Sequence, residues 1–327
     1  MSNSSGLSGT KNDWLKLYED LLLARLSEEK IRSEYSKDEM KTPVHIGIGG
    51  EAIPIGVCHV LPKSIQAFGT YRNHSLYLAL SKDVDGFFAE LYGKMAGTGK
   101  GKAGSMHLAN PEKGLIATSA VVATTIPVAV GAAFAQQYLK KDAYSVVFFG
   151  DGAVEEGVFW ESINFASLKK LKVIFVCEDN ELAIHSFAKG RQGFKSIKEV
   201  IAAFDIHFIQ ADGTRVEAVV NATEQLKLKM ESDPKPGFLH LSYFRFLEHV
   251  GPMEDFPSGY RPKPTPAELD QLDPVKNFEQ TLLANGIAKS DLDQIRSSVQ
   301  KNIDQAVVKA QKAPFPDEKE LYTDVLI

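Results

Sequence analysis

Short apolar segments alternate with segments of helical pattern along much of this chain. In the clearest run, the apolar segment Tyr144–Phe149 precedes a predicted helix at Val154–Leu168 and a second apolar segment at Val173–Val176. Strands that are apolar on both sides need both faces covered, which is typical of a parallel sheet between two layers of helices. Parallel neighbours also need a crossover connection, and the helical segments supply it. We therefore predict an α/β fold with a mostly parallel sheet and helices on both faces.

The same patterns predict three parts of the chain. Residues 1–36 are expected to form an N-terminal tail and helix, residues 37–262 an α/β domain, and residues 263–327 a helical C-terminal extension. Prolines crowd between Pro252 and Pro266, which predicts an extended segment before the C-terminal helices. Other predicted elements are helices at Trp14–Tyr35, Glu51–Val60, Val121–Tyr138, Ile197–Phe204, Arg215–Ser232 and twice within Pro274–Lys312, strands at Ala67–Tyr71, His207–Gln210 and Phe238–Phe246, and a loop at Ala183–Ser196.

Composition limits the class of protein. Among 327 residues, 37 are Lys or Arg and 42 are Asp or Glu, so the formal net charge of −5 argues against a general nucleic-acid-binding protein. Cys58 and Cys177 lie in apolar runs without a metal-binding or redox spacing, and we expect both to be buried and reduced. Met1–Asp13 has no apolar signal core, and Pro127 interrupts the apolar stretch Ala117–Ala135, so neither a secretion signal nor a membrane span is expected. These features predict a cytoplasmic protein.

A glycine-rich segment, Gly99–Gly104, matches the pattern GxGxxG. A dinucleotide-binding fingerprint requires a strand directly before it and a helix directly after it. Neither is predicted here, so we set the dinucleotide interpretation aside. Two interpretations of Lys100 and Lys102 stay open, a contact with an anion and a solvated loop, and the solvated loop is favoured.

Polar residues follow the two strongest predicted strands where each strand ends. Gly150-Asp151-Gly152 comes directly after Phe149, and Glu178-Asp179-Asn180 follows the next strand. A right-handed crossover brings both ends to the same edge of the sheet, where open α/β sheets bind their ligands. Asp151 and Asn180 then offer a carboxylate and an amide oxygen, which together with phosphate oxygens of a ligand suit Mg²⁺. The glycines let the backbone approach a phosphate, and the next helix directs its free N–H groups toward it.

The spacing of these two motifs resembles that of thiamine-diphosphate enzymes, in which a Gly-Asp-Gly motif is followed by an Asn after nearly thirty residues. Here 27 residues separate Gly152 from Asn180. The flanking residues narrow the resemblance to the α-subunits of the dehydrogenase component of 2-oxo acid dehydrogenase complexes, such as the pyruvate, branched-chain and acetoin enzymes; they are Phe159, Glu161, Asn164, Ala166 and Val176–Asp179. The similarity runs from His45 to Asp324-Val325. It implies a thiamine-diphosphate-binding fold and an oxidoreductase that acts on the oxo group of its donor.

The resemblance also implies three groups of site residues. The expected Mg²⁺ ligands are Asp151, Asn180 and the backbone carbonyl of Leu182. The expected contacts with thiamine diphosphate are Tyr71, Arg72, Ala120, Val122, Asp151, Gly152, Ala153, Asn180, Arg245 and His249. Among these, the backbone of Ala120 and Val122 would contact the aminopyrimidine ring. The expected catalytic side chains are His45, His107 and His249. Arginine suits the diphosphate because its guanidinium forms bidentate, charge-assisted hydrogen bonds.

Such α-subunits contain only the half of the active site that binds the diphosphate. The resemblance therefore implies a separate β-subunit, which supplies a catalytic Glu beside the aminopyrimidine ring in an α₂β₂ heterotetramer. The implied reaction is oxidative decarboxylation of a 2-oxo acid, or cleavage of acetoin, with acyl transfer to a lipoyl-bearing acyltransferase. We expect no nucleic-acid partner and no membrane partner.

Several positions depart from the pattern of this family. Asp179 stands where Asn is usual, His185 stands where Ser is usual, and the loop from Val250 to Tyr260 lacks the Ser that is phosphorylated in mitochondrial pyruvate enzymes. These positions lie near the expected substrate entrance, so they leave open the substrate, the acceptor and that mode of regulation. Two alternatives follow. One is a non-oxidative two-subunit carboligase or transketolase-like enzyme, and the other is a scaffold that has kept the fold without the chemistry.

Overall fold

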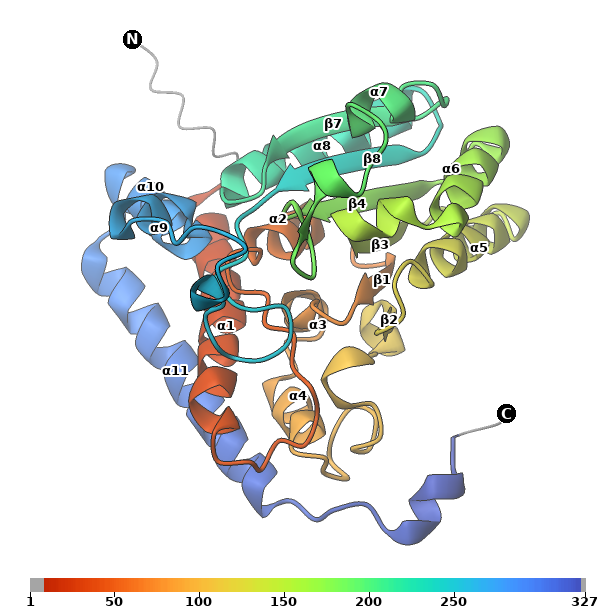
Figure 1. The fold of residues 1–327 in the computed structure, drawn as a ribbon. Helices are drawn as coiled ribbons and strands as arrows, with labels where there is room; N and C mark the ends of the chain where they lie inside the picture. Colours follow the sequence, from red (N-terminus) through yellow and green to blue (C-terminus); the bar gives the residue numbers. More distant parts are fainter. Residues whose placement is uncertain (1–8, 325–327) are drawn as a thin grey trace.

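A six-stranded sheet forms the centre of the computed structural model, which describes residues 9–324 (Figure 1). The strands lie in the order β2-β1-β3-β4-β8-β7, and every neighbouring pair is parallel. Their bounds are Gln66–Thr70 for β1, Leu115–Ser119 for β2, Ser145–Gly150 for β3, Val173–Asp179 for β4, His207–Asp212 for β7 and Gly237–Ser242 for β8. The predicted parallel sheet is confirmed.

Helices cover both faces of this sheet, as predicted. One layer contains α5 (Thr125–Tyr138), α6 (Gly157–Lys169) and the short α7 (Ile197–Ile201), and α5 and α6 lie side by side in Figure 1. The opposite layer contains α1 (Lys11–Tyr35), α2 (Ala52–Val60), α3 (His74–Ser81), α4 (Val84–Leu91) and α8 (Val216–Ser232).

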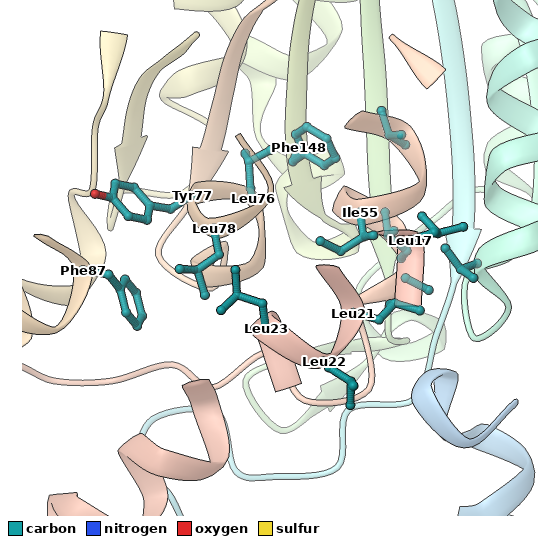
Figure 2. Packing of buried hydrophobic residues seen from close by; sticks show 14 of the residues in the cluster. Leu17, Leu21, Leu22, Leu23, Ile55, Leu76, Tyr77, Leu78, Phe87 and Phe148 are labelled. Carbon is teal, nitrogen blue, oxygen red and sulfur yellow. The ribbon is translucent and has the colours of Figure 1, made fainter. Parts of the chain in front are cut away.

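Strand β3 shows why the sheet is apolar on both sides. Val146 and Phe148 belong to the cluster beneath α1, α2 and α3, whereas Val147 and Phe149 belong to the cluster beneath α5 and α6. All four side chains are buried, because successive residues of a strand point to opposite faces and both faces are covered here. Figure 2 shows Phe148 in the first cluster, among leucines of α1 and α3.

The C-terminal part is helical, as predicted, and consists of α9 (Pro266–Leu272), α10 (Pro274–Ala284) and α11 (Lys289–Lys312). The long α11 packs beside α1 and α4 (Figure 1). The buried Arg25 of α1 joins this part to the rest, since its Nε lies 2.5 Å from Glu51 and its Nη1 lies 2.8 Å from Asp273, the N-cap of α10. The division at residues 36 and 262 stays a prediction. Two parts of the sequence predictions lie outside the described residues. They are residues 1–8 of the predicted N-terminal tail and Val325, the last residue of the similarity to the family.

Several predicted boundaries were wrong. The helix expected from Val121 begins at Thr125, because residues 121–124 form a turn in which Ala123 has a φ of +64°. The helix expected from Val154 begins at Gly157, after a 3₁₀ turn named η3 (Asp151–Glu155).

Other elements were missed. The edge strand β2 and the helices α3 and α4 were not predicted, because these short segments have a weak periodic signal. The expected loop at Ala183–Ser196 begins in a two-stranded hairpin, in which β5 (Leu182–Ala183) pairs with β6 (Ser186–Phe187).

The chain also leaves the sheet after Ser242, so the strand predicted to reach Phe246 ends four residues early and the next residues turn toward the carboxyl edge of the sheet. Of the two free cysteines, Cys177 is buried as expected, whereas Cys58 is only partly buried. No helix within residues 9–324 is both long and apolar enough to cross a membrane.

Candidate active site

A cavity of about 390 Å³ lies at the carboxyl ends of the strands. The segments that follow β1, β2, β3, β4 and β8 all contribute to its wall, including Thr70–Arg72, Ser119–Ala123, Gly150–Ala153, Glu178, Asn180, Tyr243 and Arg245. Ligands of open parallel sheets bind at this edge, close to the point where the strand order reverses. In this sheet the order reverses beside β1, which lies between β2 and β3.

Nearly all of the site residues expected from the sequence line this one cavity. They are His45, Tyr71, Arg72, Ala120, Val122, Asp151, Gly152, Ala153, Asn180, Leu182, Arg245 and His249. His107 is the exception, because it is exposed and does not line the cavity, although its neighbour Met106 does. The structure therefore does not bring His107 together with the other two histidines.

Asp151 is a buried carboxylate whose two oxygens have different surroundings. Its Oδ2 accepts a hydrogen bond of 2.5 Å from Arg191, whereas its Oδ1 is buried without a hydrogen-bond partner. Burial and the nearby charge of Asp179 raise the pKa of Asp151 to about 6, and the hydrogen bond from Arg191 opposes them. A buried carboxylate oxygen without a partner is costly, so it marks a place where a cation or a donor can bind.

Asn180 is oriented by the chain on both sides of it. Its Oδ1 accepts a hydrogen bond from the backbone N–H of Leu182 at 3.1 Å, and its Nδ2 donates to the hydroxyl of Tyr243 at 2.9 Å. The preceding residue, Asp179, turns away to His240, whose Nε2 lies 2.7 Å from the carboxylate. Burial works to raise the pKa of Asp179, but hydrogen bonds from His240 and from the backbone of Glu181 outweigh it and lower that pKa. The unusual Asp179 is thus hydrogen-bonded to a partner outside the cavity wall.

An aromatic and cationic cluster forms another part of the cavity wall. Arg72 donates from Nη1 to the carbonyl of Ile46 at 2.9 Å and from Nη2 to the carbonyl of His249 at 2.9 Å. The ring of His45 lies 4.3 Å from that of Tyr71 and 5.2 Å from that of His249, measured between centroids. Burial, together with the positive charge of Arg72, lowers the pKa of His45 to about 3 and that of His249 to about 4. Both imidazoles are therefore neutral at pH 7.

Arg245 is almost completely buried at the side of the cavity. It donates from Nε to the carbonyl of Leu247, from Nη1 to that of Ile184, and from Nη2 to Asp255 and Tyr260, at distances between 2.6 and 3.1 Å. The bonds to Asp255 and Tyr260 fix its guanidinium against the loop that departs from the family pattern. The unusual His185 also packs there, with its ring 4.6 Å from that of Tyr260.

The glycine-rich segment lies apart from the cavity. Four backbone N–H groups of this segment donate hydrogen bonds to the carboxylate of Glu90. They are those of Gly99, Gly101, Ala103 and Gly104. Lys100 and Lys102 both form ion pairs with Asp324. This segment is therefore a loop wrapped around an internal carboxylate, and the element before it is the helix α4 and not a strand, which agrees with the rejection of a dinucleotide site.

Sequence reasoning missed Tyr243 and Glu178, which line the cavity, and Arg191, which contacts Asp151. Tyr243 follows β8 directly, but it was missed because the predicted strand ran on to Phe246, which placed Tyr243 within the strand and not at its end. Glu178 was noted only for its place in the motif, yet its carboxylate accepts a hydrogen bond from Asn73, and burial raises its pKa to about 7. Arg191 lies in an irregular loop, and no periodic pattern or motif pointed to its contact with Asp151.

No cluster of three or more His, Cys, Asp or Glu side chains that could hold a metal ion occurs within residues 9–324. A metal at this edge would therefore rely on mixed oxygen ligands. A parallel α/β sheet with a Gly-Asp-Gly…Asn motif on two adjacent strand ends defines the class of thiamine-diphosphate-binding domains.

Comparison with known proteins defines the family. A family model described as "Dehydrogenase E1 component" matches residues 19–319. The chain is 31% identical over 323 residues to the α-subunit of acetoin:2,6-dichlorophenolindophenol oxidoreductase from Bacillus subtilis (strain 168), covering 98% of this chain and 96% of the relative. It is also 34% identical to the α-subunit of the pyruvate dehydrogenase E1 component from Rhizobium meliloti (strain 1021), covering 97% of this chain and 91% of the relative. The identity to the corresponding α-subunit from Porphyra purpurea is 34% as well, covering 98% of this chain and 95% of the relative.

The chain therefore belongs to the dehydrogenase E1 component family, as an α-subunit of a thiamine-diphosphate-dependent oxidoreductase of the 2-oxo acid dehydrogenase type. The family and the enzyme class predicted from the sequence are confirmed, and the family implies thiamine diphosphate as the cofactor. The relatives also favour the oxidative function over the non-oxidative carboligase alternative.

Proposed function

We propose that the cavity binds thiamine diphosphate through a Mg²⁺ ion, and that the chain, together with a β-subunit, oxidises a small 2-oxo acid or acetoin. The observation that carries this proposal is the buried Oδ1 of Asp151, which has no protein partner and lies at the carboxyl end of β3 beside Asn180. When bound, thiamine diphosphate supplies a carbon nucleophile and an electron sink for the 2-oxo group. The residues of this chain bind and orient it.

The oxygens beside Asp151 fit Mg²⁺. This ion is held by few protein oxygens and completes its shell with water and phosphate oxygens. Asp151 Oδ1, Asn180 Oδ1 and the carbonyl of Leu182 are the proposed ligands, and all three residues line the cavity. The hydrogen bonds that Asn180 forms with Leu182 and Tyr243 support this assignment, because they orient the amide before any ion binds.

The diphosphate is proposed to lie against Tyr71, Arg72, Arg245 and the backbone N–H groups of Gly152 and Ala153. An added Cβ at Gly152 would lie only 3.0 Å from the Cβ of Ala183, which favours glycine where the backbone must approach a ligand closely. The backbone of Ala120 and Val122 is proposed to contact the aminopyrimidine ring at the mouth of the cavity, where Val122 is 45% exposed.

His45 and His249 are the proposed catalytic side chains of this subunit. Because their pKa values are lowered to about 3 and about 4, both are neutral at pH 7 and can accept a proton or a hydrogen bond from the substrate. Their rings lie 5.2 Å apart on the same wall of the cavity. We assign no part to His107, because it does not line the cavity.

A β-subunit is proposed to supply the catalytic Glu and to complete an α₂β₂ heterotetramer. The layer formed by α5 and α6 supports a protein partner, because it exposes large apolar side chains, namely Val128, Phe134, Tyr138, Leu139, Phe165 and Leu168. Tyr138 is 80% exposed and Leu168 is 72% exposed, the rings of Phe134 and Phe165 lie 5.7 Å apart, and exposed apolar patches mark protein interfaces. A lipoyl-bearing acyltransferase is the proposed acceptor, and the cytoplasm is the proposed location.

The test uses the chain purified with its β-subunit, in thiamine diphosphate and Mg²⁺. Reduction of a dye acceptor is followed across a panel of 2-oxo acids and acetoin. Reduction with one substrate supports the proposal and identifies that substrate. Release of CO₂ or formation of a ligated product without dye reduction would contradict it. In parallel, Asp151→Ala should abolish Mg²⁺-dependent cofactor binding while the protein keeps its fold, whereas unchanged cofactor affinity would show that the site is misplaced.

A further inference from the structure

Arg191 holds the outer oxygen of Asp151 from a loop that is far from it in the sequence. Its Nη2 donates to Asp151 Oδ2 at 2.5 Å, its Nη1 contacts Glu155 Oε1, and its Nε donates to the carbonyl of Ser186 at 2.9 Å. The side chain is only 11% exposed. Its guanidinium is therefore fixed at three points, two on the η3 turn and one on β6.

The two oxygens of Asp151 are thus divided between two tasks. Oδ2 is bound by Arg191, and Oδ1 is left buried without a partner. A carboxylate that binds a metal through one oxygen usually has the other oxygen hydrogen-bonded, and loss of that outer partner typically weakens metal binding about 10- to 100-fold. We infer that Arg191 is a positioning residue, which orients Asp151 so that Oδ1 faces the metal–diphosphate ligand. This inference rests on the proposed function.

The same contacts attach the loop to the metal site. The Nε2 of Gln192 donates to the carbonyl of Asp151 at 3.4 Å and to Glu155 at 3.3 Å. Two residues further on, the ring of Phe194 packs at 6.0 Å against Trp160 of α6. Residues 186–194 therefore lie directly on the turn that presents Asp151. Because coupling between two sites is reciprocal, cofactor binding should in turn stabilise this loop.

The test measures binding, independently of turnover. Mn²⁺ replaces Mg²⁺, and its binding in the presence of thiamine diphosphate is followed by electron paramagnetic resonance on the full chain with its β-subunit. Arg191→Ala should weaken Mn²⁺ binding by about 10- to 100-fold. Arg191→Lys should restore part of the affinity, because a lysine keeps the charge but cannot bridge Asp151 and Glu155 in the same way.

Lys189→Ala is the matched control. Lys189 is an exposed cation of the same loop, and it forms no ion pair within the described residues, so its loss should leave Mn²⁺ affinity unchanged. Glu155→Gln provides a second route if Arg191→Ala does not fold. It keeps the arginine and removes one charged anchor of its guanidinium, so it should weaken binding in the same direction by a smaller factor.

Hydrogen exchange of residues 184–194 gives a second readout. In the wild type, thiamine diphosphate with Mn²⁺ should slow exchange in this loop, and in Arg191→Ala that protection should be lost. Unchanged Mn²⁺ affinity in Arg191→Ala would overturn the inference. Tighter binding would also overturn it, because the guanidinium would then be a cation that competes with the metal.

The Asp151→Ala variant separates this inference from the proposed function. If Asp151→Ala abolishes Mn²⁺ binding and Arg191→Ala has no effect, the metal site is correct and only the positioning role fails. If neither variant changes Mn²⁺ binding, the proposed metal site itself fails.

Discussion

Replacing Glu178 with glutamine should make the protein more stable at alkaline pH and leave its stability unchanged in acid. Glu178 is the last but one residue of β4 and lies in the wall of the cavity, and its Oε2 accepts a hydrogen bond of 2.9 Å from Asn73. Burial raises its pKa from an ordinary value of 4.5 to about 7, and the hydrogen bond from Asn73 and the charge of Arg72 reduce this effect only in part. Glutamine has the same shape, can accept the same hydrogen bond and does not ionise.

The raised pKa of Glu178 decides whether its contribution to stability grows or falls as the pH rises. Below about pH 4.5 the carboxyl is protonated in both the folded and the unfolded chain, so the stability associated with its raised pKa is fully present. As the pH rises through about 7, the buried group must ionise in the folded state, and that stability is lost. Each pKa unit corresponds to about 1.4 kcal/mol, so the difference between 4.5 and about 7 amounts to about 3 kcal/mol.

The assay is urea unfolding of the cofactor-free protein, wild type and Glu178→Gln, at several pH values between about 5 and about 9. The difference between the two free energies of unfolding isolates Glu178, because other titrating groups are common to both proteins. The difference should grow with pH in favour of the Glu178→Gln variant, up to about 3 kcal/mol. A difference that does not change with pH, or one that favours the wild type at high pH, would refute the reasoning.

Three further predictions concern the core and the site. Arg25→Ala should reduce the free energy of unfolding by about 3–5 kcal/mol, because the buried Glu51 loses its partner at 2.5 Å. A loss below about 1 kcal/mol in urea unfolding would contradict this prediction. Gly49→Ala should lower the free energy of unfolding by more than about 1 kcal/mol in the same assay, since φ of Gly49 is +105° and an added Cβ would overlap the carbonyl oxygen of Phe244. A variant as stable as the wild type would show that the backbone adapts. Because the pKa of His249 is lowered to about 4, this residue gains a proton only in acid. The pH profile of kcat/KM for the αβ enzyme should therefore show no inflection from His249 near pH 6.5. An inflection there that disappears in a His249→Asn variant would disprove this prediction.

Much of the fold was predictable because its signal is local. Val146 and Phe148 face one helical layer while Val147 and Phe149 face the other, and such a continuous apolar run can only be satisfied between two layers. The edge strand β2 gave no such signal, because its middle residues are only partly buried. The turn before α5 was also not predictable, since the φ of +64° at Ala123 is imposed by its surroundings rather than by its residue type.

The sequence by itself determined which chemical groups meet at the carboxyl edge of the sheet. Asp151 and Asn180 follow adjacent parallel strands, and the handedness of the crossover brings such ends together whatever the remaining contacts are. Only the tertiary structure decided how those groups are oriented and charged. The pairing of Arg191 with Asp151, the pKa of about 7 at Glu178 and the neutral state of His249 all depend on burial and on partners distant along the chain. Short-range patterns carry no information about these contacts, because desolvation and charge pairing act through space.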